Sequence, residues 1–390
     1  MKVEQVYELT NTIAQELMGE SVIVNEDLSN VVDIGKAFEN MGDRYDKYVR
    51  SLHDHIGKMW FVNRTYSGGS PNILMDGWEF GSILEKVRAD MPQAEENESW
   101  ELQDRTSYDP NIFYKPAVHA KFFNNRVTFE IPISITEKQV RSAFSNATQL
   151  NAFYSMIYNA VDKAMTVRLD SLIDRTINAG IAETMYDAFP AGTYTGTTVR
   201  AVNLLKLYNE QFTQTLTFAQ AMFSPEFMRY ASYVIKNYLA YLKRMSKCFN
   251  IKGYPQFTSD PSMILLSQFR NGVETYLESD TFHNQLVAIG KNNVTDVPYF
   301  QGSGTDFALG SATKIHVEVP LPTDETQKKE IEASGILGVM FDWKSCMINN
   351  NNPRVTSNYN GKAEFTNYWY KEDCSYVTRP SRNFIVFFAA

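Results

Sequence analysis

Residues 118–135 read VHAKFFNNRVTFEIPISI, and this stretch carries the sharpest structural signal in the chain. Its second half alternates between apolar and polar side chains, which is typical of a strand with one buried face. The apolar positions are Val127, Phe129, Ile131, Ile133 and Ile135. Asn tolerates the positive φ of tight turns, so Asn124 and Asn125 predict a turn that joins 118–123 to this strand as a long β-hairpin. Pro132 lacks a backbone donor, which places the strand at a sheet edge or a bulge.

A long helix is predicted soon after this strand. Thr136 and Gln139 have the spacing of a capping box, in which each side chain bonds the other residue's backbone N–H. Over residues 147–179 apolar side chains recur every three or four positions, and Gly180 is a natural residue for the helix end. At about 1.5 Å per residue this helix is roughly 50 Å long. A rod of that length needs other elements or other subunits to brace it.

The sequence before this region reads as an arm more than as a compact domain. Residues 1–75 contain one short amphipathic pattern, at 4–18, and finish near a Gly/Ser/Pro-rich loop. Residues 75–88 predict a strand or turn that leads into a helix. The segment 89–110 carries seven acidic residues and one Arg, which predicts an exposed loop.

Residues 200–345 predict a separate α+β body. Ser224 and Pro225 form a helix start, with Ser as the N-cap and Pro at the first helical position. Apolar spacing carries this helix to about residue 247. Further apolar or alternating runs predict strands at 262–266, 285–289 and 313–320, and a helix at 267–280.

The last part of the sequence is predicted to be β again. Within 353–370, Asn360-Gly361 lies between two alternating runs and is a strong hairpin signal. Residues 384–390 are all apolar. Because neither face of this run is polar, we expect a final strand that is covered on both sides.

Composition and charge narrow the class of protein. The chain has 390 residues, a net charge of −8 and 13% aromatic residues. A net negative charge argues against a protein whose main task is to grip phosphates. Three cysteines far apart predict reduced thiols and not a disulfide framework. We expect no secretory signal and no transmembrane helix, because neither an apolar leader nor a run of about 20 apolar residues occurs.

The sequence offers no convincing catalytic or metal-binding pattern. Nucleotide-binding, zinc-protease and nucleophile-elbow motifs are absent from it. His53 and His55 flank an Asp, but a metal site needs a third ligand, so we interpret them as polar residues of the arm. Cys248 lies in a basic helix end and is interpreted as an inert thiol. The Gly-bearing stretch 302–310 has the wrong order for a phosphate loop. We therefore expect no catalytic residue, no metal and no cofactor.

This order of elements resembles the major capsid protein of tailed bacteriophages, which has the Hong Kong 97 type capsid fold. The resemblance rests on the sequence of arm, hairpin with KFFNNRVTFEIPISI, capped turn, long helix, α+β body and late hairpin. The phrase GILGVMFDWKSC and the residues after it are also similar in style to the ends of small podophage capsid proteins. The resemblance implies an α+β fold with four parts: an N-terminal arm (1–75), a peripheral domain (76–199) with an extended loop (100–135) and a spine helix (147–179), an axial domain (200–345), and a C-terminal β segment (346–390) that returns to the peripheral and axial sheets.

The resemblance also implies a function, partners and contact residues. The chain would be a non-enzymatic virion protein, the major capsid subunit that assembles as hexamers and pentamers into an icosahedral shell around the phage genome. It would be made in the host cytoplasm and would work with other copies of itself, a scaffolding protein and a portal, touching packaged DNA only non-specifically and no membrane. The residues expected at contacts between subunits are Phe122, Phe123, Asn124, Asn125 and Arg126 in the extended loop, and Trp60 and Phe61 in the arm. Some family members link a loop Lys to a neighbour's Asn, but nothing around Lys115 or Lys121 carries that chemistry.

Two other classes of protein remain open at this stage. One is a different shell or tail structural subunit, such as a tail-tube, portal or encapsulin-like protein. The other is a carbohydrate-active enzyme that uses paired carboxylates and aromatic platforms, because acidic and aromatic residues are both plentiful.

Overall fold

A computed structural model of the chain describes residues 7, 10–15, 24–25, 29–30, 32–34, 36, 51, 73–75, 84–89, 102–107, 118–123, 126–136, 138–139, 142, 147–278, 294–300, 312–320, 327–378 and 381–390. The helices are α5 (Ala147–Ala188), α6 (Leu204–Phe212), α7 (Phe218–Ala221), α8 (Pro225–Leu242) and α9 (Ser267–Glu278). The strands are β1 (Leu74–Met75), β2 (Leu84–Ala89), β3 (Val118–Phe123), β4 (Arg126–Thr136), β5 (Ala201–Asn203), β6 (Ser262–Leu266), β7 (Val294–Val297), β8 (Ile315–Pro320), β9 (Lys328–Ala333), β10 (Ile336–Phe341), β11 (Cys346–Asn360), β12 (Phe365–Thr378) and β13 (Phe384–Phe388).

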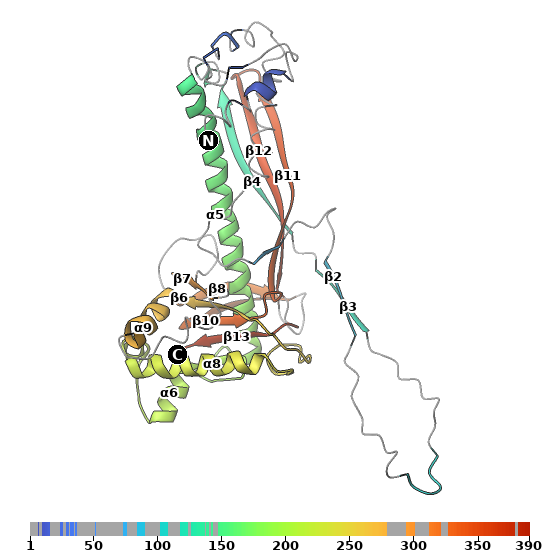
Figure 1. Cartoon of the computed structure of the whole chain (residues 1–390), viewed down its shortest axis with the longest axis vertical. Coiled ribbons are helices and arrows are strands. Elements are labelled where there is room, and N and C mark those ends of the chain that lie inside the picture. The colour runs from blue at the N-terminus through green and yellow to red at the C-terminus, as the bar shows by residue number, and fades with distance from the viewer. Residues whose placement is uncertain are drawn as a thin grey trace.

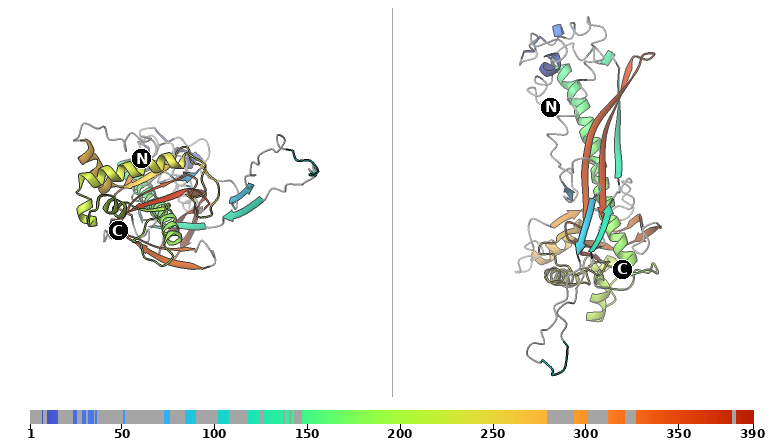
Figure 2. Two further views of the ribbon diagram at one scale, coloured as in Figure 1. Left: turned by 90° about the horizontal axis from the view of Figure 1, so that it is seen from below. Right: turned by 90° about the vertical axis from the view of Figure 1, so that its right-hand side faces the viewer.

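The long helix α5 connects two sheets at opposite ends of an elongated α+β molecule (Figure 1). A four-stranded sheet, in the order β1-β11-β12-β4, lies along the helix. A five-stranded sheet, in the order β5-β13-β10-β6-β7, lies at the other end with α6, α8 and α9. Figure 2 shows the same elongated arrangement from two further directions. The 42 residues of α5 span roughly 63 Å at about 1.5 Å per residue.

The predicted strand 126–135 is confirmed, but its predicted partner is wrong. β4 pairs with β12 through eleven residue pairs, from Arg126 opposite Ser375 to Thr136 opposite Phe365. β3 pairs instead with β2, where a helix was expected to begin. The physical reason is length, because β3 has six residues and could not cover the eleven-residue face of β4. β4 lies at the edge of its sheet, as Pro132 predicted.

The four-stranded sheet and α5 bury a common core. Between residues 147 and 169 of α5, the apolar residues with at most 1% of their surface exposed form a stripe at helical spacing: Leu150, Tyr154, Ile157, Val161, Met165 and Leu169. β12 alternates buried and half-buried residues along its length, as a strand with one covered face does. The helix, β4, β11 and β12 are therefore one packed unit, and the sheet braces the rod that the sequence predicted.

The capping box is confirmed, but the helix does not end at Gly180. The backbone N–H of Gln139 donates to Thr136 Oγ1 at 3.3 Å, and Thr136 N–H donates to Gln139 Oε1 at 3.0 Å. α5 continues for eight residues past Gly180 to Ala188. A Cβ at Gly180 would lie 3.0 Å from the Phe384 ring and 3.3 Å from the Cys346 sulfur. The glycine thus permits a close approach of helix and strands within a continuing helix.

The run 384–388 forms the second strand in the order of the five-stranded sheet. β13 is parallel to β5 and antiparallel to β10, and all five of its residues are buried. This confirms the expected cover on both faces. Ser224 caps α8 by accepting from Phe227 N–H at 3.3 Å, and α8 ends at Leu242, earlier than predicted. The predicted strands at 262–266 and 313–320 and the helix after 267 are also present, whereas 285–289 lies outside the described residues.

The late hairpin is confirmed with a longer turn than Asn360-Gly361 predicted. Asn360 pairs with Phe365, so four residues and not two connect β11 to β12. Asn360 Oδ1 accepts from the backbone N–H groups of Lys362 and Ala363 at 3.1 and 3.3 Å. The Asn side chain therefore closes this turn by hydrogen bonding, which is a second way in which Asn favours turns.

Candidate assembly surface

The ribbon of β2 and β3 stands beside the rest of the molecule (Figures 1 and 2). Leu84 lies opposite Phe123 at one end of the ribbon, and Ala89 lies opposite Val118 at the other. The segment that joins the two strands, 90–117, includes most of the acid-rich stretch. Six of its residues, 102–107, are described, and all six are exposed as the sequence predicted.

The contact residues expected from the sequence lie near the base of this ribbon. Phe122 and Phe123 are the last two residues of β3, and Arg126 begins β4. Asn124 and Asn125 lie between these strands, and they fall outside the described residues, as do Trp60 and Phe61 of the arm. The chain therefore passes from the ribbon into the four-stranded sheet between Phe123 and Arg126, within the predicted loop residues.

The face of the four-stranded sheet that turns away from α5 carries a network of cross-strand polar contacts. Asp373 on β12 accepts two hydrogen bonds from Arg354 on β11, at 2.6 and 3.1 Å, and one from Thr128 Oγ1 on β4 at 2.7 Å. Lys371 pairs with Glu130 across the same strands at 3.1 Å. The hydrogen bonds to Asp373 raise the pKa of the Arg354 guanidinium above its ordinary value. The contacts hold the three long strands of this face in register.

One aromatic side chain lies within this polar face. Trp369 is half-buried and lies opposite Thr356 on one side and Pro132 on the other. The Lys371 ammonium lies 6.0 Å from the centre of its ring. Aromatic residues with a polar surround are common at the centre of protein interfaces. No feature of the sequence separated Trp369 from a core residue, because only the pairing of β4, β11 and β12 reveals which face it occupies.

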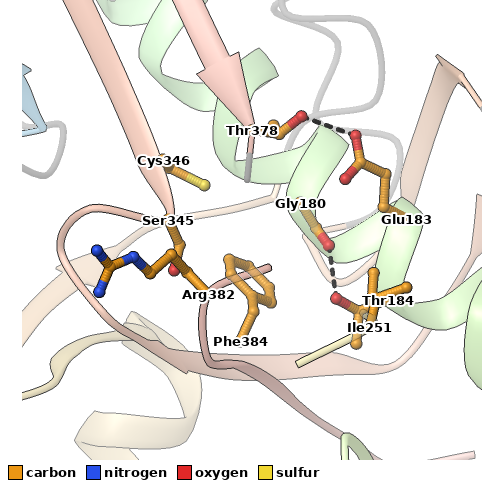
Figure 3. A pocket seen from close by; sticks show the side chains of 9 residues that line it. All are labelled: Gly180, Glu183, Thr184, Ile251, Ser345, Cys346, Thr378, Arg382 and Phe384. Carbon is orange, nitrogen blue, oxygen red and sulfur yellow. Dashed lines mark hydrogen bonds between the residues drawn. The ribbon is translucent and has the colours of Figure 1, made fainter. Parts of the chain in front are cut away.

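Figure 3 shows the point where α5 meets the strands of both sheets, with a cavity of about 10 Å³. Glu183 of α5 accepts from Thr378 Oγ1 of β12 at 2.7 Å. The Cys346 sulfur, at the start of β11, lies 3.9 Å from the Thr176 carbonyl oxygen. The lining residues are Gly180, Glu183, Thr184, Ile251, Ser345, Cys346, Thr378, Arg382 and Phe384.

The thiol at this junction is unreactive, and the cavity beside it is small. Burial and the nearby negative charge of Glu183 raise the pKa of the Cys346 thiol far above its ordinary value, so it stays protonated and is a poor nucleophile. A cavity of about 10 Å³ holds no more than one water molecule. Among the described residues, no group of His, Cys, Asp or Glu side chains is arranged to hold a metal ion. His53 and His55 lie outside those residues.

Several large apolar side chains are exposed on this subunit. In the part of the chain that the structure describes, they are Leu102, Met156, Val167, Val199, Phe212, Phe223, Tyr233, Tyr241, Met245, Phe257 and Trp343, each with 44 to 71% of its surface accessible. Met156 and Val167 lie on the side of α5 opposite to the buried stripe. None of the helices in the described ranges is long and apolar enough to cross a membrane. Single exposed apolar residues are ordinary in folded proteins, whereas a contiguous apolar patch marks an interaction site.

The comparisons with known proteins agree with this architecture. The sequence matches the family of Phi29-like phage major capsid proteins over residues 10–388. It matches no curated protein. A chain of the capsid structure of Staphylococcus phage Andhra is 12% identical, with 84% of this chain and 86% of that chain covered and a TM-score of 0.53. This likeness shows the fold.

Two further solved structures are similar at lower scores. One is the structure of the head fiber and inner core protein of bacteriophage P68, at 11% identity, 82% and 83% coverage and a TM-score of 0.48. The other is from Mycobacterium phage Ogopogo, at 10% identity, 84% and 94% coverage and a TM-score of 0.44. The family match covers nearly the whole chain. The chain therefore belongs to the Phi29-like phage major capsid protein family, and it is a structural subunit of the virion shell.

Proposed function

We propose that this subunit builds the shell as hexamers and pentamers that are joined by the β2–β3 ribbon together with its connection (residues 90–117), and by the N-terminal arm. The proposal rests on the β2–β3 ribbon. Among the described strands, β2 and β3 pair only with each other, and the ribbon stands beside the body (Figure 1). An isolated two-stranded ribbon is at best marginally stable in water, so contact with a neighbouring copy would complete it. Multiplied by closed symmetry, modest contacts of this kind give a stable shell.

The division into parts follows the same reasoning. In this proposal residues 1–75 are the arm, 76–199 the peripheral domain with the spine helix, 200–345 the axial domain, and 346–390 the returning β segment. The residues proposed to touch a neighbouring copy are Phe122, Phe123, Asn124, Asn125 and Arg126 at the base of the ribbon, with Trp60 and Phe61 in the arm. The cross-strand contacts of Asp373 and the braced helix support a peripheral unit that keeps its shape while neighbours dock against it.

The proposed partners are those of a shell subunit without catalytic activity. A scaffolding protein would direct assembly, and a portal would occupy one site in the shell. Packaged DNA would be touched only non-specifically, since a net charge of −8 keeps the genome from being held against the wall. The protonated Cys346 thiol and the small size of the junction cavity support a structural role for that junction.

The test is a variant in which a short turn joins β2 directly to β3 and residues 90–117 are removed. Ala89 and Val118 lie directly opposite each other, so residues 90–117 can be replaced by Asn-Gly, which favours a two-residue hairpin turn. We expect this variant to fold, as judged by circular dichroism and a cooperative melt, and to fail to form shells in electron micrographs. A control replaces 90–117 by a Gly/Ser segment of equal length. It separates the effect of losing the side chains of this segment from the effect of shortening the segment. Normal shells from the Asn-Gly variant would show that the connection is dispensable and that the proposal is wrong.

A further inference from the structure

One surface of the subunit is basic although the chain as a whole is acidic. Residues 227–259 contain six basic residues and no Asp or Glu: Arg229, Lys236, Lys243, Arg244, Lys247 and Lys252. The chain has 37 basic and 45 acidic residues, so the remainder carries 31 − 45 = −14. Most of this positive charge follows the end of α8, in a segment we call the basic loop (residues 243–258). Figure 1 shows it at the edge of the five-stranded sheet body.

The basic loop has a fixed shape. Ser246 and Gln256 exchange two backbone hydrogen bonds, at 2.9 and 3.0 Å, and Thr258 N–H donates to Leu242 O at 2.7 Å. Within the loop, the buried Asn250 side chain donates to Tyr254 O at 2.7 Å and accepts from Tyr254 N–H at 2.8 Å. A loop that is ordered before binding loses little conformational entropy when a partner docks.

The loop presents apolar side chains together with its charges. Met245 and Phe257 flank the paired Ser246 and Gln256, so they lie opposite each other across the two strands of the loop. Met245 is 51% exposed and Phe257 is 54% exposed, and Tyr241 in the last turn of α8 is 53% exposed. Met245 and Phe257 therefore form a paired apolar patch, and Tyr241 lies four residues before Met245 in the sequence.

The charges of the patch are available to a partner. Lys243, Arg244 and Lys247 are exposed, and the described residues offer them no ion pair within their own subunit. Positive charge near a helix C-terminus is favourable in itself, but this accounts for the charges and not for the apolar side chains beside them. Arg, Met and Tyr are enriched at the centre of protein interfaces, whereas contacts to duplex DNA phosphates are made by charged and polar groups and give exposed apolar side chains such as Met245 and Phe257 no role.

We propose that the basic loop docks on an acidic surface of a neighbouring copy of this chain in the shell. A second copy is present at high local concentration in any shell, and its residues outside 227–259 carry a net formal charge of −14, opposite in sign to the basic loop. Complementary charge guides association and excludes wrong orientations. The contact is heterologous, since the basic loop of one copy meets a different surface of the next. Such contacts form a ring where the rotation between successive copies closes, as it does in a hexamer or a pentamer. The inference rests on the chain being a shell subunit.

The chain carries its own probe for this contact. Cys248 lies in the basic loop and is exposed, whereas Cys346 and Cys374 are buried. Maleimide labelling can therefore be followed at Cys248 by peptide mass spectrometry in three samples: dissociated subunits, shells without DNA and filled virions. We expect labelling to be slowed by roughly tenfold or more in both kinds of shell, because a thiol must be accessible to react.

The three samples separate the possible partners. Equal rates in dissociated subunits and in DNA-free shells would overturn the proposal. Protection only in filled virions would also overturn it, because DNA would then be what covers the loop. Since the measurement uses shells that have already formed, a negative result concerns this loop and leaves the ribbon and the arm untouched.

A charge reversal tests the same contact by assembly. We expect the variant K243E/R244E/K247E to give shells at a yield lower by about tenfold or more, because like charges that face each other oppose the contact. The matched control, K243R/R244K/K247R, keeps every charge and should assemble normally. Circular dichroism and melting of the unassembled variants report whether each has folded. Normal assembly of the reversed variant would contradict the proposal, and the labelling experiment decides the question if that variant does not fold.

Discussion

Asn203 makes the most specific polar contact to the last residues of the sequence. Its side chain is fully buried and is the N-cap of α6, where Oδ1 accepts from Lys206 N–H at 3.1 Å. The same amide donates to Ala390 O at 2.9 Å and accepts from Ala390 N–H at 3.4 Å. One side chain therefore caps a helix and holds Ala390, two residues after the end of β13. Replacing Asn203 by Ala removes both functions, and replacing it by Ser retains a good capping group only.

The free energy lost with each function can be worked out from the usual energies of an N-cap and of a hydrogen bond. Loss of an N-cap costs about 1 kcal/mol. Each of the two bonds to Ala390 adds roughly 0.5 kcal/mol, the lower end of the usual range, because Ala390 is exposed and water can replace the amide. Asn203→Ala should therefore lower the free energy of local opening by about 2 kcal/mol, and Asn203→Ser by about 1 kcal/mol.

Hydrogen exchange at the backbone of β13 measures this opening directly. A loss of about 1 or 2 kcal/mol corresponds to roughly 5-fold or 30-fold faster exchange where exchange follows local opening. Peptides from α9 serve as an internal reference, since Asn203 does not bond that helix. The reasoning fails if the Ser variant exchanges as fast as the Ala variant, or if neither differs from the unaltered protein.

Three further predictions concern stability and its dependence on pH. Gly335→Ala should lower the free energy of unfolding by at least about 2 kcal/mol, because φ is +79° and a Cβ would lie 2.1 Å from the backbone oxygen of Ala389. Gly253→Ala, at φ +63° and with no atom within 4 Å of the added Cβ, should lower it by about 1 kcal/mol, and urea unfolding of both variants checks this. Phe387→Ala should cost about 3–5 kcal/mol because this side chain is fully buried, and Phe223→Ala, at a side chain 71% exposed, should stay within about 0.5 kcal/mol in the same assay. Because the pKa of Cys346 is raised, the folded protein keeps this proton, whereas the unfolded thiol loses it above about pH 9. The free energy of unfolding should therefore fall with rising pH by up to about 1.4 kcal/mol per pH unit. If Cys346→Ala leaves the pH dependence of this free energy unchanged between about pH 8.5 and 9.5, the reasoning is wrong.

The sequence predicted elements far better than it predicted their partners. Alternation over 127–135 and the apolar run at 384–388 are local patterns, and both produced the expected strands. The partner of β4 lies more than 200 residues later in the sequence, and no local pattern identifies it. The Asn124-Asn125 pair suggested the nearest candidate, which the longer face of β12 outcompetes.

One glycine prediction was wrong, and one asparagine prediction was right in kind but gave too short a turn. Gly180 was read as a helix end because glycine favours that position, yet here it allows Phe384 and Cys346 to approach a continuous helix. Asn360 predicted a two-residue turn and instead closes a four-residue one through its side chain. The assembly surface was hardest to foresee, since exposure of Trp369 or Phe257 depends on tertiary packing, although the absence of acids from 227–259 was visible in the sequence.

The position of β13 has a consequence for the order in which this protein is made. The strand is inserted between β5 and β10, so the five-stranded sheet has a gap in its interior until residues 384–388 have left the ribosome. Until then, β5 lacks its hydrogen-bonded partner strand, and the apolar faces next to it remain uncovered. Pairing of such distant segments is also slow, because a long loop must close first. A nascent subunit therefore cannot complete this body before residues 384–388 have been made, which delays its entry into a growing shell until that point.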